Sequence, residues 1–422
     1  MGIFSEQVKT RNIAEGLTTL VMPTGVKDVI TISGSILGGS LHTITKNHKI
    51  PSLAAAMLDK GTELKDKYKI SETLESVGAE LNFSSTQYHT NFTGFCLKNN
   101  LKSVISLLAE QLQKPLFSNE ELATLKTRII GNLERQKEDT KKRATIGLLR
   151  ALFPQTHPNY RETLEKSIQL ISQVTSKELA TFHKATYGLG SLNIVAAGDL
   201  QPQAFNALIQ EAFGGWSLRQ LELPPIIEKA KPPQKGSETI HVPDKTSTDV
   251  FIGQPIGIDR EHENYYDLMM AVYILGGNFS ARLMQTVRDQ QGLTYGIGSS
   301  ISGVSFGSDG YWSTWGTFAP EILKKGQKAT MDQIELWFKK GITKDELSAK
   351  KTTISGSFKV SMDSTSGLTG KILSNAEQGR PIDYLDKYPE IINSLTLENV
   401  NAAIKTYIDP KNLFTISAGT DE

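Results

Sequence analysis

Arg288 and Tyr295 are the two residues whose types and spacing could best perform chemistry in this chain. A guanidinium and a phenol hydroxyl both donate hydrogen bonds, so a neighbouring pair could hold a carbonyl oxygen as it becomes an oxyanion. Both residues also have an ordinary explanation. An arginine near a helix C-terminus complements the helix dipole, and tyrosine is common in strands. The residues alone leave the two interpretations open.

A helix is expected over residues 279–290, which would place Arg288 near its C-terminus. Apolar side chains recur every four positions along one face, at Phe279, Leu283 and Val287. A short polar and glycine-containing loop precedes this helix, Gly276-Gly277-Asn278. That loop is either part of a site or simply a helix-entry turn.

A strand is expected over residues 293–301, after Gly292 has ended the helix. Polar and apolar residues alternate along it, so Tyr295 should point to the same face as Ile297 and Ser299. A tight turn between this helix and this strand would aim Arg288 and Tyr295 at one point in space.

Composition excludes several classes of protein. The chain has 422 residues, with 46 Lys plus Arg against 45 Asp plus Glu, and its net charge of +1 argues against nucleic acid or an anionic membrane as main partner. The single cysteine, Cys96, excludes an internal disulfide framework and a multi-cysteine metal site. No window approaches the ~18 apolar residues of a membrane span. We expect the periplasm if a secretory signal has been removed, and otherwise the cytoplasm.

The order of expected elements is strand–strand–helix–helix–strand–strand–helices, which indicates an α+β fold with mostly antiparallel sheets. One long helix is expected from Ser118 to about Arg143, and another over 146–153. Two segments share a Thr–helix–Tyr–turn–Asn–strand–Ala-Gly pattern, Thr175–Gly198 and Thr396–Gly419. This internal repeat predicts a duplication. A proline-rich connector separates the copies, so we expect domains at 1–216 and 239–422 joined by a linker at 217–238.

The sequence resembles the pitrilysin/insulinase superfamily of zinc metallopeptidases, which includes mitochondrial processing peptidase, and in length it resembles the half-length bacterial members. The resemblance covers essentially the whole chain. Its motifs follow in the family's order and spacing: Glu15-Gly16-Leu17, Met57 to Thr62, Gly78 to Asn82, Lys114 to Phe117, Phe153 to Pro158, Gly276-Gly277 and Arg288 to Tyr295.

The zinc motif of active members is missing from this chain. Those members carry His-x-x-Glu-His immediately before the Met-Leu-x-Lys-Gly-Thr run, and the two histidines bind zinc while the glutamate activates its water. Ser52, Ala55 and Ala56 occupy the three functional positions here. The family's third ligand is a later glutamate, and Glu134 is either its remnant or an ordinary surface residue. One carboxylate cannot hold zinc, so we expect no metal on this chain.

The resemblance gives Arg288 and Tyr295 a role, because active members have an Arg and a Tyr seven residues apart that stabilise the tetrahedral intermediate. The Gly276-Gly277-Asn278 loop matches the family's glycine-rich loop. In heterodimeric bacterial members, one chain brings zinc and the other supplies Arg and Tyr. The resemblance therefore implies a non-catalytic subunit, with zinc on a paralogous partner and an unfolded peptide as substrate.

Other functions remain possible at this point. The chain could be purely structural, like the core proteins of the respiratory cytochrome bc complex, or a peptide-binding module that performs no chemistry. A self-sufficient hydrolase is disfavoured because no Ser or Cys has a recognisable base beside it. Without its partner, the chain could also form a homodimer.

Overall fold

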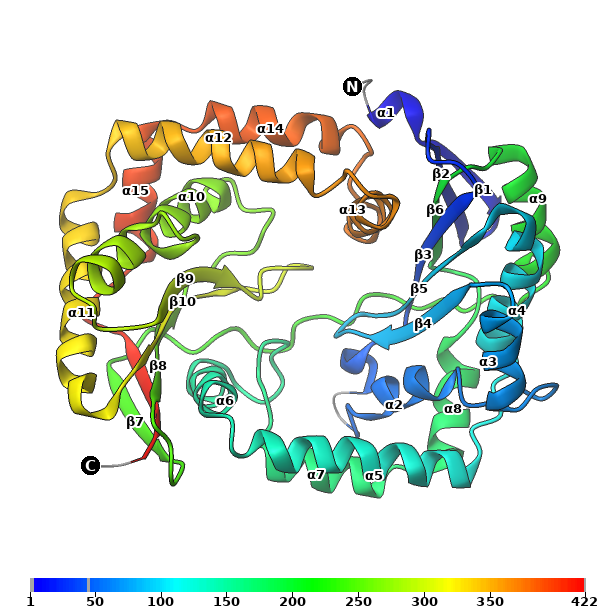
Figure 1. Cartoon of the computed structure of the whole chain (residues 1–422), viewed down its shortest axis with the longest axis horizontal. Helices are drawn as coiled ribbons and strands as arrows, with labels where there is room; N and C mark the ends of the chain where they lie inside the picture. The colour runs from blue at the N-terminus through cyan, green and yellow to red at the C-terminus, as the bar shows by residue number, and fades with distance from the viewer. Residues whose placement is uncertain (1–3, 44–45, 421–422) are drawn as a thin grey trace. The chain divides into compact units, whose positions relative to one another are not determined.

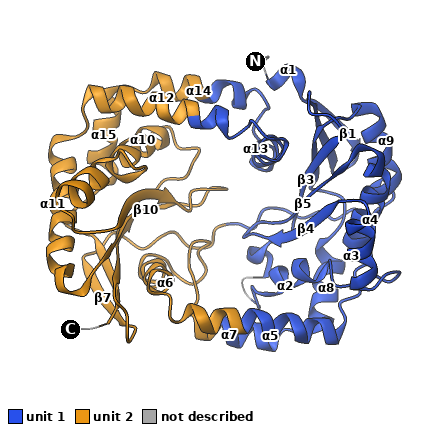
Figure 2. Cartoon of the chain, in the orientation of Figure 1, with its two compact units in different colours: residues 1–130, 167–225, 357–388 blue, residues 131–166, 226–356, 389–422 orange. Residues whose placement is uncertain are grey.

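The structure is a computed structural model that describes residues 4–43 and 46–420. Two compact units divide the chain. Unit 1 comprises residues 1–130, 167–225 and 357–388, and unit 2 comprises residues 131–166, 226–356 and 389–422 (Figure 2). The units interleave in sequence, so each contains stretches from both halves that the repeat predicts.

Unit 1 is built on a sheet of six strands in the described part of the chain, ordered β1-β2-β6-β3-β5-β4. Strand β6 pairs in parallel with β2 and antiparallel with β3, and the other pairs are antiparallel. The strands are β1 (Lys9–Ala14), β2 (Leu17–Pro23), β3 (Val29–Leu37), β4 (Glu80–Ser85), β5 (His89–Leu97) and β6 (Leu192–Gly198).

Helices of unit 1 surround this sheet (Figure 1). They are α1 (Phe4–Gln7), η1 (Ser40–Thr43), α2 (Ile50–Met57), α3 (Lys67–Glu75), η2 (Lys98–Asn100), α4 (Leu101–Gln113), α8 (Ser176–Thr186), α9 (Pro202–Phe213) and α13 (Thr365–Glu377). Four further helices have residues in both units: α5 (Asn119–Gln136), α7 (Leu164–Gln173), α12 (Lys344–Val360) and α14 (Tyr384–Ser394).

A helix from late in the sequence covers the sheet of unit 1. Helix α13 packs on β3 and β6, where Ile372 and Leu373 join a buried cluster with Val195. Its hydroxyl groups also bond to the strand, with 2.9 Å between Ser33 Oγ and Thr369 Oγ1. The core of unit 1 therefore depends on residues more than three hundred positions apart.

Unit 2 repeats this architecture with five strands in the described residues, ordered β7-β11-β8-β10-β9. Strand β11 pairs in parallel with β7 and antiparallel with β8, as β6 does with β2 and β3. The strands are β7 (Gly236–His241), β8 (Thr248–Pro255), β9 (Gly296–Ser302), β10 (Tyr311–Phe318) and β11 (Phe414–Gly419). The equivalent topologies confirm the α+β duplication.

The helices of unit 2 are α6 (Thr140–Leu152), α10 (Tyr265–Gly276), η3 (Met284–Gln290), η4 (Pro320–Ile322), α11 (Leu323–Lys340) and α15 (Leu397–Tyr407). Helix α6 comes from early in the sequence and covers β8 and β11 through a buried apolar cluster that includes Leu148, Phe251 and Ile416. At its first turn, Thr140 Oγ1 donates to Asp249 Oδ2 at 2.6 Å. No helix in the described chain is long and apolar enough to cross a membrane.

The repeated segments have matching helix starts. Thr175 caps α8 with its hydroxyl, which accepts from the Glu178 N–H, and the Glu178 carboxylate bonds back to Thr175 in a capping box. Thr396 caps α15 in the same way by accepting from the Asn399 N–H. Each helix is followed by an interior strand of its sheet, β6 or β11.

Three local predictions need correction. The expected long helix ends at Gln136, because Asp139 accepts from the Lys142 N–H and starts α6 instead. Phe279 does not join the apolar face of the next helix, since its side chain is 81% exposed while Leu283 is buried. Tyr295 precedes β9 and is 95% exposed, so it does not share a face with the buried side chains of that strand.

Candidate functional site

Arg288 is bonded to the backbone of Tyr295, while the expected convergence of the two side chains on one point stays a prediction. Arg288 belongs to η3, and a turn at Gly292 with φ of 64° leads to Tyr295. The Arg288 Nε–H donates to the backbone carbonyl of Tyr295 at 3.1 Å, and Nη1 donates to Asp289 Oδ1 at 3.1 Å. The guanidinium thus fixes the backbone at Tyr295 rather than the phenol itself.

The arginine side chain stays available for a ligand. A guanidinium has five N–H groups, and among the described residues Arg288 has acceptors only on Tyr295 and Asp289. The Arg288 side chain is 42% exposed. The segment η3 is a π-helix, with the Gln291 N–H bonded to the Thr286 carbonyl at 3.2 Å, and such wide turns are frequent at functional sites. The arrangement offers exposed N–H donors on Arg288 and an exposed phenol on Tyr295.

The glycine pair before η3 is required by close packing. A Cβ on Gly276 would lie 2.5 Å from the backbone nitrogen of Ser299, so only glycine lets the end of α10 rest on β9. A Cβ on Gly277 would lie 2.3 Å from the ring of Tyr273. The two glycines therefore have a packing role whether or not their loop binds a ligand.

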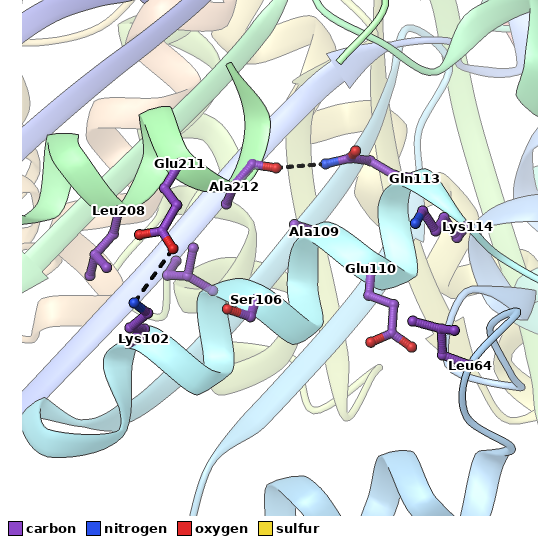
Figure 3. Close-up of a pocket in the computed structure, with 11 residues that line it drawn as sticks. Leu64, Lys102, Ser106, Ala109, Glu110, Gln113, Lys114, Leu208, Glu211 and Ala212 are labelled. Carbon is purple, nitrogen blue, oxygen red and sulfur yellow. Dashed lines mark hydrogen bonds and ion pairs between the residues drawn. The ribbon is translucent and has the colours of Figure 1, made fainter. Parts of the chain in front are cut away.

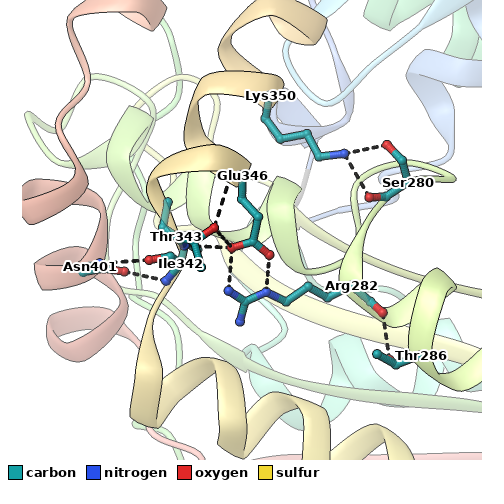
Figure 4. Close-up of polar contacts among 8 residues, drawn as sticks. All are labelled: Ser280, Arg282, Thr286, Ile342, Thr343, Glu346, Lys350 and Asn401. Carbon is teal, nitrogen blue, oxygen red and sulfur yellow. Dashed lines mark hydrogen bonds and ion pairs between the residues drawn. The ribbon is translucent and has the colours of Figure 1, made fainter.

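Lys350 of α12 anchors the loop that follows these glycines (Figure 4). Its Nζ donates to Asn278 Oδ1 at 3.0 Å, to the Ser280 carbonyl at 3.1 Å and to Ser280 Oγ at 2.6 Å. The Lys350 side chain is buried, and burial lowers its pKa while the charge of Glu346 opposes that shift.

An ion pair holds the next turn of the chain to the same helix. Arg282 Nε and Nη2 donate to the two carboxylate oxygens of Glu346 at 2.5 and 2.6 Å (Figure 4). Glu346 Oε2 also accepts from the backbone N–H of Thr343 at 2.8 Å. Sequence reasoning missed both Lys350 and Glu346, because their partners are 70 and 64 residues away and no local pattern links them.

The degenerate zinc-motif positions lie on α2 in unit 1. Ser52 is exposed, and its Oγ donates to the Lys49 carbonyl at 2.9 Å. Ala55 is buried and Ala56 is half-buried. Two alanines provide no donor atom, and the one hydroxyl is already committed to the helix backbone. The residues present do not fit a zinc ion.

Glu134 makes an ordinary surface contact. It is exposed on α5 and pairs with Lys137 one turn later at 2.7 Å. Within residues 4–43 and 46–420, no three His, Cys, Asp or Glu side chains are grouped as metal ligands would be.

His157 is buried and has a structural role. It lies in the Phe153–Pro158 segment, one of the motifs on which the family resemblance rests. His157 Nδ1 accepts from the Asn159 N–H at 3.0 Å, so Nε2 must carry the proton that bonds to Asp309 Oδ1 at 2.9 Å. Its ring also stacks on Phe153 with 4.4 Å between centroids. Asp309 in turn accepts from the Ala230 N–H at 2.9 Å. These bonds join three loops of unit 2 and leave neither ring nitrogen for catalysis.

A surface groove of about 270 Å³ lies between α4 and α9 in unit 1 (Figure 3). Two ion pairs occupy most of its charged side chains: Lys102 bonds to Glu211 at 3.4 Å, and Glu110 bonds to Lys65 beside the groove at 2.5 Å. Paired charges at a rim do not create a reactive group, so the groove offers no chemistry comparable to that of Arg288 and Tyr295.

Comparison with known proteins matches both halves of the chain. Residues 25–166 match the family model for insulinase, peptidase family M16, and residues 173–354 match the model for the peptidase M16 inactive domain. An uncharacterized zinc protease of Mycobacterium tuberculosis is 25% identical over 83% of this chain and 79% of its own length. A non-peptidase homolog of Helicobacter pylori is 26% identical over 89% of this chain and 85% of its own length.

Solved structures agree with these matches. The crystal structure of a peptidase M16 inactive domain from Pseudomonas fluorescens has a TM-score of 0.88 and 25% identity, covering 98% of each chain. A protease structure from Helicobacter pylori, at 17% identity and a TM-score of 0.84, covers 98% of this chain and 99% of its own and shares the fold. The chain belongs to peptidase family M16, in the pitrilysin/insulinase superfamily, as a homologue of the inactive, non-peptidase kind.

Proposed function

We propose that this chain is the non-catalytic subunit of a heterodimeric zinc metalloendopeptidase. Its partner is a paralogous subunit that carries the zinc motif, and the substrate is an unfolded peptide. Arg288 and Tyr295 donate hydrogen bonds to the scissile carbonyl oxygen as that oxygen gains negative charge. The partner's zinc supplies the activated water for peptide-bond hydrolysis.

One observation carries this proposal. The Arg288 guanidinium is held against Tyr295, with N–H groups to spare, in a chain whose own zinc positions are Ser52, Ala55 and Ala56. A chain that had lost all participation in catalysis would have no need of an exposed donor pair. Keeping the donors while lacking the metal ligands is consistent with a division of labour between two chains.

The chemistry suits the residue types. A guanidinium keeps its charge at any physiological pH, and so Arg288 stabilises an oxyanion without a proton transfer. The Tyr295 phenol adds a neutral donor, and its 95% exposure leaves it able to approach a ligand. The backbone bond from Arg288 to the Tyr295 carbonyl limits the movement of both residues before substrate arrives.

The test is hydrolysis of a fluorogenic, unstructured peptide by this chain alone, by a zinc-bearing paralogue alone and by the two mixed. We expect turnover to rise strongly on mixing and to vanish when a chelator removes the partner's zinc. No gain on mixing would refute the proposal and favour an inert structural or peptide-binding protein. Turnover by this chain alone would also refute it.

A further inference from the structure

Loop 276–280 of unit 2, the segment Gly276 to Ser280, is held by a buried ammonium. Lys350 is 5% exposed, and the three N–H groups of its ammonium bond to three oxygen atoms of the loop, two on Ser280 and one on Asn278. Burying an ammonium is unfavourable unless such bonds compensate it. The hydrogen bonds of the Lys350 ammonium therefore fix this surface loop, because they compensate the burial of the ammonium only while the loop keeps this conformation.

The other side of the loop is fixed as well. Asn278 Nδ2 donates to the Tyr273 hydroxyl at 3.1 Å, and Asn278 Oδ1 accepts from the Ser280 N–H at 3.2 Å. Gly276 and Gly277 rest on β9 and on the Tyr273 ring at distances that no larger residue allows. The loop backbone is thus constrained on both sides of a single residue.

That residue is Phe279, whose side chain is 81% exposed between the two anchored residues Asn278 and Ser280. A lone exposed apolar side chain is ordinary on a protein surface. On a rigid loop, however, such a side chain can bind a ligand at a lower entropic cost. Little conformational entropy is lost when a pre-ordered aromatic residue contacts a ligand, and such residues carry much of the energy of an interface.

We propose that Lys350 is a positioning residue that fixes loop 276–280, and that Phe279 is the side chain this loop presents to an apolar residue of the bound peptide. The inference rests on the proposed peptide substrate and adds a determinant of which peptides are chosen. Phe279 lies in the turn that precedes the helix containing Arg288, nine residues earlier in the chain.

The loop itself is tested by hydrogen exchange on the isolated chain. Lys350→Met keeps the side chain's length and apolar stem, so the fold should persist, but the loop loses its three bonds. We expect faster amide exchange over residues 277–281 in this variant. The matched control is Lys351→Met, which removes a neighbouring lysine that bonds elsewhere, to the Asn393 carbonyl. Unchanged exchange in Lys350→Met would overturn the positioning role.

Peptide selectivity is tested by measuring binding affinity with fluorescence anisotropy. Two disordered, fluorescein-labelled peptides are compared, which are identical except that one carries a leucine where the other carries a serine. The leucine is placed in turn along the peptide. We expect the intact chain to prefer leucine by about fivefold or more at one position, the size of one good apolar contact. Phe279→Ala and Lys350→Met should lose this preference. Leu336→Ala, which removes another exposed apolar side chain of unit 2, should keep it.

The outcomes separate this inference from the proposed function. A leucine preference that survives in Phe279→Ala would overturn the inference even if turnover on mixing were observed. A preference that depends on Phe279, in a chain that gives no turnover with any partner, would support the inference and refute the proposed catalytic role. Arg288→Ala should leave the preference intact, because the oxyanion contact forms in the transition state rather than in the bound peptide.

Discussion

Replacement of Arg288 by alanine should lower the turnover of the heterodimer strongly while changing the folding stability of the chain only slightly. The side chain is 42% exposed, and its two hydrogen bonds, to Tyr295 and Asp289, lie at the surface. Exposed bonds of this kind contribute about 1 kcal/mol or less to folding. Loss of one oxyanion donor, by contrast, costs about 3–4 kcal/mol of transition-state stabilisation, or about 100- to 1,000-fold in kcat.

The assay is turnover of a fluorogenic peptide by the mixed heterodimer, with urea unfolding of the isolated chain measured in parallel. Arg128→Ala is the matched control, because Arg128 is an exposed arginine on α5. We expect the control to leave both quantities unchanged. Tyr295→Phe should lower kcat as well, and the double variant should lose less than the sum if both groups bind one oxygen.

Two results would refute this reasoning. Turnover by Arg288→Ala within a factor of about two of the intact pair would show that the guanidinium does not contact the reacting oxygen. Loss of several kcal/mol of folding free energy would show that the arginine is structural. Weaker association of the variant with its partner must be measured separately, by titration, so that it is not mistaken for lost catalysis.

Three further predictions concern the scaffold. Burial lowers the pKa of His89 to about 4 from an ordinary 6.5, so the unfolded chain protonates first as pH falls. Stability should therefore drop by up to about 3 kcal/mol between pH 6.5 and 4, and His89→Gln should reduce this pH dependence in urea unfolding. Gly276→Ala would place a methyl group 2.5 Å from a backbone nitrogen of β9, and should cost about 2 kcal/mol. Gly356→Ala, with open space around its Cβ, should not destabilise the chain; equal thermal melts of the two variants would contradict this. Arg282→Met should cost about 2 kcal/mol by leaving the half-buried Glu346 unpaired, and a Glu346→Gln change in the same chain should recover part of it in chemical unfolding.

Several features of the protein can be derived from the sequence alone, because they depend on neighbours in the chain. Alternation of side chains predicts a strand over 293–301, most of which forms β9, and Gly292 predicts the turn before it. The repeated threonine caps reveal the duplication before any coordinate is known. The loss of metal donors at Ser52, Ala55 and Ala56 is a matter of side-chain chemistry and needs no geometry.

Other features depend on contacts between residues that are distant in sequence, and these were decided only by the tertiary structure. Phe279 fits the apolar spacing of a helix, but a loop held by Lys350 from α12 keeps it in water. Helices α6 and α13 each complete the core of a unit whose sheet comes from the other sequence half, and no local pattern specifies that exchange. Arg288 meets Tyr295 through a backbone carbonyl because the π-helical turn places it there. Spacing can predict that two residues meet, but which atoms make the contact depends on packing from the rest of the chain.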